Sequence, residues 1–152
     1  MELNHPPSVT YSETVRPPAW LLAFLLFLTE SVALSVWAAF DNRTGVFAFV
    51  IALLIVVASA FALSLQIEVT EDELRVGRAH IERRYLGEVT ELEANAMARV
   101  RGRDADPAAY LALRFWQPRG IKVEVRDDRD PSPYWLITTK KPIELSQALR
   151  QS

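Results

Sequence analysis

The side chains that could do chemistry are few and scattered in this sequence of 152 residues. His80 and Glu82 have the spacing of two metal ligands on one face of a strand, yet His5 is the only other histidine. Cysteine is absent, which excludes disulfides, thiolate metal sites and a cysteine nucleophile. The sequence also contains no Gly-x-Ser-x-Gly elbow, Walker motif or dinucleotide-binding glycine pattern. We therefore expect a non-enzymatic protein without a cofactor or a metal ion.

An acidic turn is the second place where metal chemistry is conceivable. Asp127, Asp128 and Asp130 follow one another closely, but Arg126 and Arg129 are interleaved with them. Neither a glycine nor a downstream bidentate glutamate completes a calcium-binding loop of the EF-hand kind. We expect no calcium site here.

One carboxylate is unusual because of its surroundings. Glu30 lies in the middle of a long apolar run, where an acidic side chain costs about 2.5–3.5 kcal/mol if the run crosses a bilayer. We expect Glu30 to face protein and not lipid. Two interpretations stay open: a proton-linked, cation-linked or partner-binding site, and a structural carboxylic acid bonded to a hydroxyl such as that of Thr29 or Ser31.

Aromatic and basic side chains gather in one predicted turn. Phe115, Trp116 and Arg119 lie within it, and Lys122 follows. Such a group suits insertion at a membrane interface or contact with a protein partner. The alternative is that its rings only cover the end of a sheet core.

The elements that position these residues begin with two apolar runs, residues 19–40 and 46–65. The first contains a single charged residue, Glu30, and the second contains none. About 20 residues of helix cross a hydrocarbon core of about 30 Å. The five residues between the runs cannot bridge a bilayer, so the sequence predicts an antiparallel transmembrane hairpin with both chain ends on one side.

Arginine sets the predicted orientation of this hairpin. Arg16 precedes the first run, and several arginines follow the second, whereas the connecting loop contains only Arg43 beside Asp41. Because cytoplasmic flanks carry an excess of basic residues, we expect both termini to be cytoplasmic and the protein to lie in the cell membrane. Spacings of small residues, Ser31 with Ser35, Ala48 with Ala52 and Ala58 with Ala62, are candidates for the helix contact.

After the second run the pattern changes to strand-like alternation. The sequence predicts a separate soluble domain over residues 66–152, with strands at 66–70, 73–76, 79–83, 86–92, 110–114, 121–125 and 134–138, and helices at 93–101 and 142–150. We expect strands 110–114 and 121–125 to form a hairpin. Alternation from Val9 to Val15 suggests that the tail, residues 1–18, adds an edge strand. The domain contains 15 basic and 15 acidic residues, which gives no basic excess for binding nucleic acid.

About seven strands followed by one helix are typical of a small β-sandwich or partly open barrel closed by a helix, and resemble bacterial pleckstrin-homology-like domains. Four segments, 73–77, 85–89, 106–110 and 130–139, resemble an uncharacterised actinobacterial family of two-pass membrane proteins, a domain-of-unknown-function family. The resemblance covers nearly the whole chain. It implies the topology and the fold but no activity and no catalytic residues.

The expected fold is thus an α+β membrane protein with a transmembrane hairpin at residues 19–65 and a pleckstrin-homology-like domain. The leading functional hypothesis is a membrane-anchored binding or scaffold module at the inner leaflet. The alternatives are a small accessory subunit of a transport or envelope-assembly complex, and an enzyme acting on lipid. The expected partners are the lipid bilayer and, as an open alternative, a protein or a second copy of the chain in the membrane.

Overall fold

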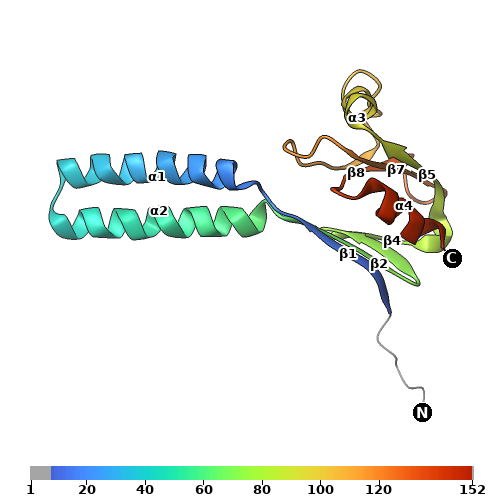
Figure 1. The fold of residues 1–152 in the computed structure, drawn as a ribbon, viewed down its shortest axis with the longest axis horizontal. Helices are drawn as coiled ribbons and strands as arrows, with labels where there is room; N and C mark the ends of the chain where they lie inside the picture. The colour runs from blue at the N-terminus through green and yellow to red at the C-terminus, as the bar shows by residue number, and fades with distance from the viewer. Residues whose placement is uncertain (1–7, 152) are drawn as a thin grey trace, which may run out of the picture. The chain divides into compact units, whose positions relative to one another are not determined.

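The computed structural model describes residues 8–151, and Figure 1 shows their helices and strands. In chain order the elements are β1 (Val9–Val15), α1 (Ala19–Ala39), α2 (Asn42–Ala62), β2 (Leu65–Thr70), β3 (Glu73–Val76), β4 (Ala79–Glu82), a 3-10 turn (Arg83–Tyr85), β5 (Leu86–Leu92), α3 (Ala94–Arg101), β6 (Tyr110–Ala112), β7 (Gly120–Val125), β8 (Tyr134–Thr138) and α4 (Pro142–Arg150). The chain divides into two compact units. Residues 16–64 form the helical unit, and the residues on both sides of them form the sheet unit.

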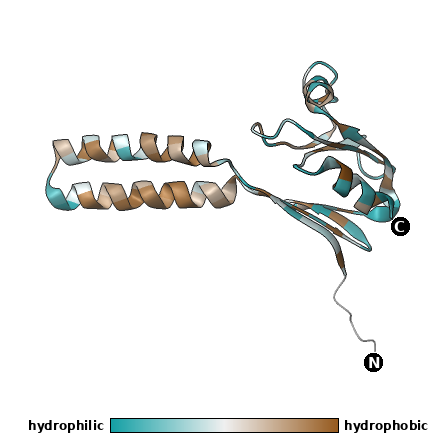
Figure 2. Ribbon diagram, in the orientation of Figure 1, coloured by the Kyte–Doolittle hydropathy of each residue, from teal (hydrophilic) through white to brown (hydrophobic). Residues whose placement is uncertain are grey.

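The helical unit consists of α1 and α2, each 21 residues long. At a rise of 1.5 Å per residue each helix is about 32 Å in length. Both are long and apolar enough to cross a membrane, and Figure 2 shows apolar residues along both. Their buried residues are few: Leu21 and Ala33 in α1, and Gly45 and Ala52 in α2. The unit therefore exposes most of its apolar surface.

The connection between the helices is shorter than predicted, because α2 begins at Asn42 and not at residue 46. The Asp41 carboxylate accepts hydrogen bonds from the amides of Arg43 and Thr44, at 3.0 and 3.4 Å, and from the Thr44 hydroxyl at 2.6 Å. These bonds satisfy amides of the first turn that have no partner inside the helix. The expected five-residue loop is wrong, since most of it is the first turn of α2.

Among the small residues expected at the helix contact, only Ala52 is buried, at 4% exposed. Ala33, which was not among them, is 2% exposed. Ser31 and Ser35 are exposed, and their hydroxyls donate to main-chain carbonyls one turn earlier, at 2.6 and 2.9 Å. Near the connection, the Trp37 ring meets the Phe49 ring edge-on, with centroids 5.4 Å apart.

The first sheet of the other unit has the strand order β1-β2-β3-β4, and every neighbour is antiparallel. The last pair of the β1–β2 ladder is Val15 with Leu65. The helical unit is therefore an insertion between two adjacent, paired strands. This pairing also explains why α2 ends at Ala62, three residues before the predicted end of the apolar run.

The second sheet has the order β5-β7-β8-β6. The predicted hairpin between residues 110–114 and 121–125 is wrong, because β6 pairs with β8 in parallel and β7 pairs with β8 from the other side. The segment between β6 and β7 crosses the end of β8 and does not turn tightly. Gly120 permits this crossing, since a Cβ at this position would lie 2.2 Å from the Ile137 carbonyl oxygen.

Two cores hold the sheet unit together. The larger one contains fully buried residues of both sheets, such as Ile67, Leu74 and Ile137, together with Leu145 of α4. The smaller one lies where α3 covers the second sheet. All five residues of β8 are buried, because the strand faces both cores and has a neighbouring strand on each side.

Candidate functional site

The predicted aromatic and basic turn forms a loop, residues 113–119, that is bound to the end of β8. The Arg114 amide donates to the Thr138 hydroxyl at 3.1 Å, and the buried Gln117 side chain donates to the Thr139 carbonyl at 2.7 Å. The Thr139 amide in turn donates to the Arg119 carbonyl at 3.2 Å. These bonds fix the loop to a fully buried strand, so its tip is presented by a rigid base.

The two aromatic residues of this loop differ in exposure. One fits contact with a membrane or a partner, and the other fits packing against the sheet core. Phe115 is 66% exposed, whereas Trp116 is half-buried, and their rings meet edge-on at 4.9 Å. The Trp116 Nε1 atom is buried and has no hydrogen-bond partner among the described residues. Trp116 thus packs against the unit and supports Phe115, which projects outward.

Lys122 does not belong to the same surface. It lies on β7 opposite Leu136, on the face of the second sheet that α3 covers. Its ammonium group stands 4.5 Å from the centre of the Tyr134 ring. A cation over an aromatic face is a local stabilising contact, so the structure brings Phe115, Trp116 and Arg119 together and places Lys122 elsewhere.

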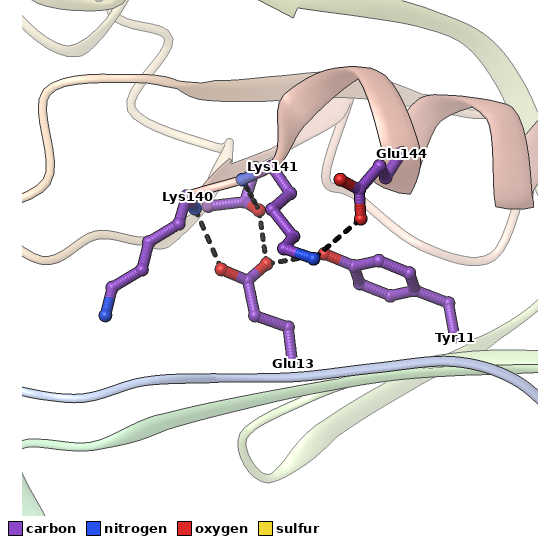
Figure 3. Close-up of polar contacts among 6 residues, drawn as sticks. Tyr11, Glu13, Lys140, Lys141 and Glu144 are labelled. Atoms are coloured by element: carbon purple, nitrogen blue, oxygen red, sulfur yellow. Dashed lines mark hydrogen bonds and ion pairs between the residues drawn. The ribbon is translucent and has the colours of Figure 1, made fainter.

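A polar network joins β1 to the turn between β8 and α4 (Figure 3). The Glu13 carboxylate accepts hydrogen bonds from the Tyr11 hydroxyl at 2.7 Å, from the Lys140 amide at 2.9 Å and from the Thr139 hydroxyl. Each donor satisfies part of a carboxylate that is only partly exposed. This network ties the strand that precedes α1 to the second sheet.

The network also changes the acidity of its phenol. Partial burial of Tyr11, followed by its hydrogen bond to Glu13 and the charge of that carboxylate, raises the pKa of the phenol well above its usual value. The phenolate would stand beside the negative charge of Glu13 in a partly buried position. Tyr11 therefore remains a hydrogen-bond donor at neutral pH.

Basic side chains surround the network. Figure 3 shows the exposed Lys140 side chain extending away from the Glu13 carboxylate, whereas Lys141 pairs with Glu144 at 2.9 Å. Arg119 is exposed and lies next to Lys140, because its carbonyl accepts from the Thr139 amide. Arg119 and Lys140 are thus two exposed basic residues on neighbouring main-chain segments, and Arg119 belongs to the loop that carries Phe115.

Glu30 lines an apolar groove of the helical unit. The groove has a volume of about 370 Å³ and is also lined by Phe27 and Phe49. The Glu30 Oε2 atom is buried and has no hydrogen-bond partner among the described residues. The hydroxyls of Thr29 and Ser31, which one of the two interpretations paired with Glu30, donate to main-chain carbonyls.

A polar hollow of about 450 Å³ between β5 and α4 contains two arginines. The Arg83 guanidinium donates to the carbonyls of Ala148 and Leu149, at 2.9 and 3.0 Å, and so binds the end of α4. The Arg150 guanidinium donates to the Val89 carbonyl at 2.8 Å. Both arginines hold the fold together, which leaves the hollow poorly suited to an anion.

The residues with metal-ligand spacing do not converge. Glu82 pairs with Arg84 at 2.8 Å, and Asp127 pairs with Arg129 at 3.2 Å. Within residues 8–151 no three His, Asp or Glu side chains gather in an arrangement that could hold a metal ion. His5 lies outside the described residues.

Glu13, Thr139 and Lys140 were not predicted from the sequence to be parts of one site. Glu13 was visible only as one position in an alternating strand, and the 126 residues that separate it from Thr139 hide their contact. Glu13 lies on the inner side of a predicted edge strand. An acidic residue at such a position indicates hydrogen-bond donors on a neighbouring element, because a partly buried carboxylate needs them.

Residues 10–149 match the family model described as "Protein of unknown function (DUF3093)". No curated protein matches the chain. No solved structure matches it either. The match covers both the helical unit and the sheet unit.

Proposed function

The chain belongs to this family of unknown function, and from its structure we propose that it is a membrane-anchored, non-enzymatic binding or scaffold module at the inner leaflet of the cell membrane. The helical unit is the two-pass anchor and both termini are cytoplasmic. The sheet unit is the binding part.

The observation that carries this proposal is the pairing of Val15 with Leu65. The apolar hairpin leaves the sheet unit from β1 and returns to it in the adjacent strand β2. The domain is therefore joined to its anchor at two points, by β1 before the hairpin and by β2 after it. Such a double connection suits a binding or scaffold module that stays anchored to the membrane.

The exposure of the helices supports the membrane part of the proposal. Phe24, Leu54 and Phe61 are 53%, 61% and 78% exposed. Water would disfavour this surface by about 25 cal/mol per Å², whereas lipid tails or other membrane helices cover it without cost. The basic residues that follow α2 favour cytoplasmic ends.

We assign the sheet unit to a pleckstrin-homology-like fold by analogy. Its first four strands form an antiparallel meander, β5, β7 and β8 are antiparallel neighbours, and α4 closes the larger core. On this reading α3 and β6 are additions between β5 and β7. Folds of this kind bind headgroups or peptides, and the analogy supports a binding role without naming the ligand.

Cysteine accessibility tests the anchor and its orientation, because the natural sequence contains no cysteine. In intact cells, Thr44→Cys should react with a membrane-impermeant maleimide, whereas Ser132→Cys should react only after permeabilisation. The reverse pattern would refute the orientation. Release of the protein from membranes by alkaline carbonate would refute the anchor itself.

A second candidate function, an accessory subunit of a larger membrane complex, is favoured by Glu30. Its buried Oε2 atom lacks a partner among the described residues and lines a groove on the hairpin. In a low-dielectric surrounding such an atom calls for a donor from a neighbouring helix.

Substitution at this position separates the two candidates. If a partner subunit binds Glu30, Glu30→Leu should lose stoichiometric co-purification of a membrane protein in mild detergent, and Glu30→Gln should keep it in part. Ser35→Leu, an apolar change at an exposed position of α1 outside this groove, is the matched control. Equal recovery of partners with all three variants would eliminate the subunit function.

A further inference from the structure

We propose that the sheet unit touches the anionic surface of the membrane that anchors it, through a basic tip formed by Arg78, Phe115, Arg119 and Lys140. This inference rests on the proposed function and deepens it, because it names the ligand class of the binding surface. The ligand is the layer of acidic phospholipid headgroups, with Phe115 entering the interfacial region between them.

The members of the basic tip lie at one end of the sheet unit. Glu13 accepts from the Lys140 amide, and the Thr139 amide donates to the Arg119 carbonyl. On the first sheet, Glu13 is opposite Ile67, and Ile67 is opposite Val76. With neighbouring strands about 4.8 Å apart, Glu13 and Val76 are about 10 Å from each other.

Arg78 completes this end, because it lies two residues beyond Val76 in the exposed turn between β3 and β4. The acidic groups at the same end are largely engaged. Glu13 accepts three hydrogen bonds, and Glu144 pairs with Lys141. Lys141 offsets Glu144, and Glu13 offsets one of the remaining cations, so Arg78, Arg119 and Lys140 leave this end with a net positive charge although the whole domain is close to neutral.

Covalent connectivity places a limit on the distance from the tip to the first helix. Ala19, the first residue of α1, follows Glu13 by six residues, a span of at most about 20 Å when fully extended. Glu13 is itself bonded to the main chain of Lys140. Only a short stretch of chain thus joins this part of the sheet unit to the segment that we propose crosses the bilayer.

The exposed ring gives the tip an apolar component. Phe115 is 66% exposed on a loop that is bonded to the buried end of β8. Half-buried Trp116 supports the ring edge-on. An aromatic ring flanked by cations matches the headgroup region, where the ring contacts the acyl boundary and the cations meet phosphate.

The experiment uses the full chain reconstituted in liposomes, with an environment-sensitive fluorophore attached to Pro118→Cys. Pro118 is exposed in the same loop, and the natural chain offers no other thiol. In bilayers that contain phosphatidylglycerol, spin-labelled lipid should quench this probe strongly. In pure phosphatidylcholine the quenching should be several-fold weaker. A probe at Asp128→Cys, beyond the opposite end of β7, should remain unquenched in both.

Charge removal is the decisive comparison. Each cation near an anionic surface contributes about a fivefold change in the contact equilibrium, so Arg78→Gln with Arg119→Gln and Lys140→Gln should weaken contact on the order of a hundredfold. The matched control removes three exposed arginines elsewhere, with Arg99→Gln, Arg101→Gln and Arg103→Gln. High salt should release the Pro118→Cys probe from the bilayer in the protein that keeps all three cations.

Equal quenching in both lipids, or equal quenching of the tip and control variants, would overturn the proposal. A probe that stays in water in every pure bilayer would also overturn it and would direct the search toward a protein partner. Either result leaves the anchor intact, since alkaline extraction and the cysteine labelling of Thr44 report on the anchor separately.

Discussion

The two units of this protein place similar side chains in opposite surroundings. Leu54 of α2 is 61% exposed and Phe61 is 78% exposed, whereas Leu74 and Trp135 of the sheet unit are 0% and 4% exposed. Both units are rich in apolar residues, but only the sheet unit covers them with its own chain. The helical unit satisfies its main-chain hydrogen bonds internally and leaves its side chains to the environment.

This difference shows which contacts stabilise each unit. In the sheet unit every buried side chain has partners from other strands or from α4, so a single change disturbs many contacts. In the helical unit the intramolecular contact is narrow and centres on Ala33 and Ala52. We expect substitutions of equal size to have large effects in the first case and small effects in the second.

The largest expected effect concerns β1. Replacing residues 16–64 by Asn-Gly joins Val15 directly to Leu65 through a two-residue turn that fits their pairing. This shortened chain should be soluble and unfold cooperatively in urea. A fragment of residues 65–152 should be less stable by about 5 kcal/mol, since burial of Val15 contributes about 1.5–3 kcal/mol and the hydrogen bonds to Glu13 together contribute a similar amount.

The control for this comparison is the shortened chain with Thr10→Ala, an exposed change in β1 that should alter the urea midpoint little. If residues 65–152 alone unfold at the same urea concentration as the joined chain, β1 is not part of the sheet unit. The division of the molecule into two units would then have to be redrawn.

Adding one methyl group at a glycine in each unit tests how tightly the two units are packed. A Cβ on Gly120 would lie 2.2 Å from the Ile137 carbonyl oxygen, and one on Gly45 would lie 2.4 Å from the Trp37 ring. Main chain in the middle of a sheet cannot move aside, whereas the partly exposed Trp37 can rotate. We expect Gly120→Ala to lower the free energy of unfolding by about 3 kcal/mol and Gly45→Ala by at most about 1 kcal/mol.

Urea unfolding followed by circular dichroism in mild detergent measures both variants. Trp37 fluorescence should change in Gly45→Ala, while the transition of the sheet unit stays in place. A Gly45→Ala protein as unstable as Gly120→Ala would show that the helical unit is as tightly packed as the sheets, contrary to the comparison.

The smallest expected effect is the response of the sheet unit to alkali. The pKa of Tyr11 is raised in the folded state from its ordinary value of 10.0. The associated stability is therefore fully present below about pH 10 and is lost as the pH rises further. The loss is at most about 1.4 kcal/mol per pH unit, reduced by solvent because the phenol is only half-buried.

Urea midpoints at pH 8 and pH 11 reveal this response in the natural sequence. Tyr11→Phe should be less stable at pH 8, because Glu13 loses a donor, and should show a smaller further decrease at pH 11. An identical pH dependence for both proteins would mean that Tyr11 titrates as it does in the unfolded chain.

Local patterns were sufficient for most of the elements. The alternation of Glu73 to Val76 and the helical spacing after Pro142 predicted β3 and α4 with their observed bounds. The apolar runs predicted two helices long enough to cross a membrane. These features depend on neighbours within a few residues, and a sequence displays such neighbours directly.

The sequence did not show which distant strands pair with each other. Residues 110–114 and 121–125 resemble a hairpin because they are close in sequence, yet β8 lies between β6 and β7. The loop that separates these strands is bonded to the Thr138 hydroxyl and to the Thr139 carbonyl, and neither bond leaves a distinctive spacing in the sequence. The start of α2 was missed for a different, local reason: Asp41 was interpreted as part of a turn and not as the cap of a helix.

The pairing of Val15 with Leu65 also bears on the order in which the chain assembles during synthesis. Strand β1 leaves the ribosome first and has no partner until the hairpin and β2 have followed. Closing a long loop carries an entropic cost that grows with its length. A hairpin already inserted in a bilayer would bring its two ends together in advance, so that the membrane acts as the template on which the first sheet closes.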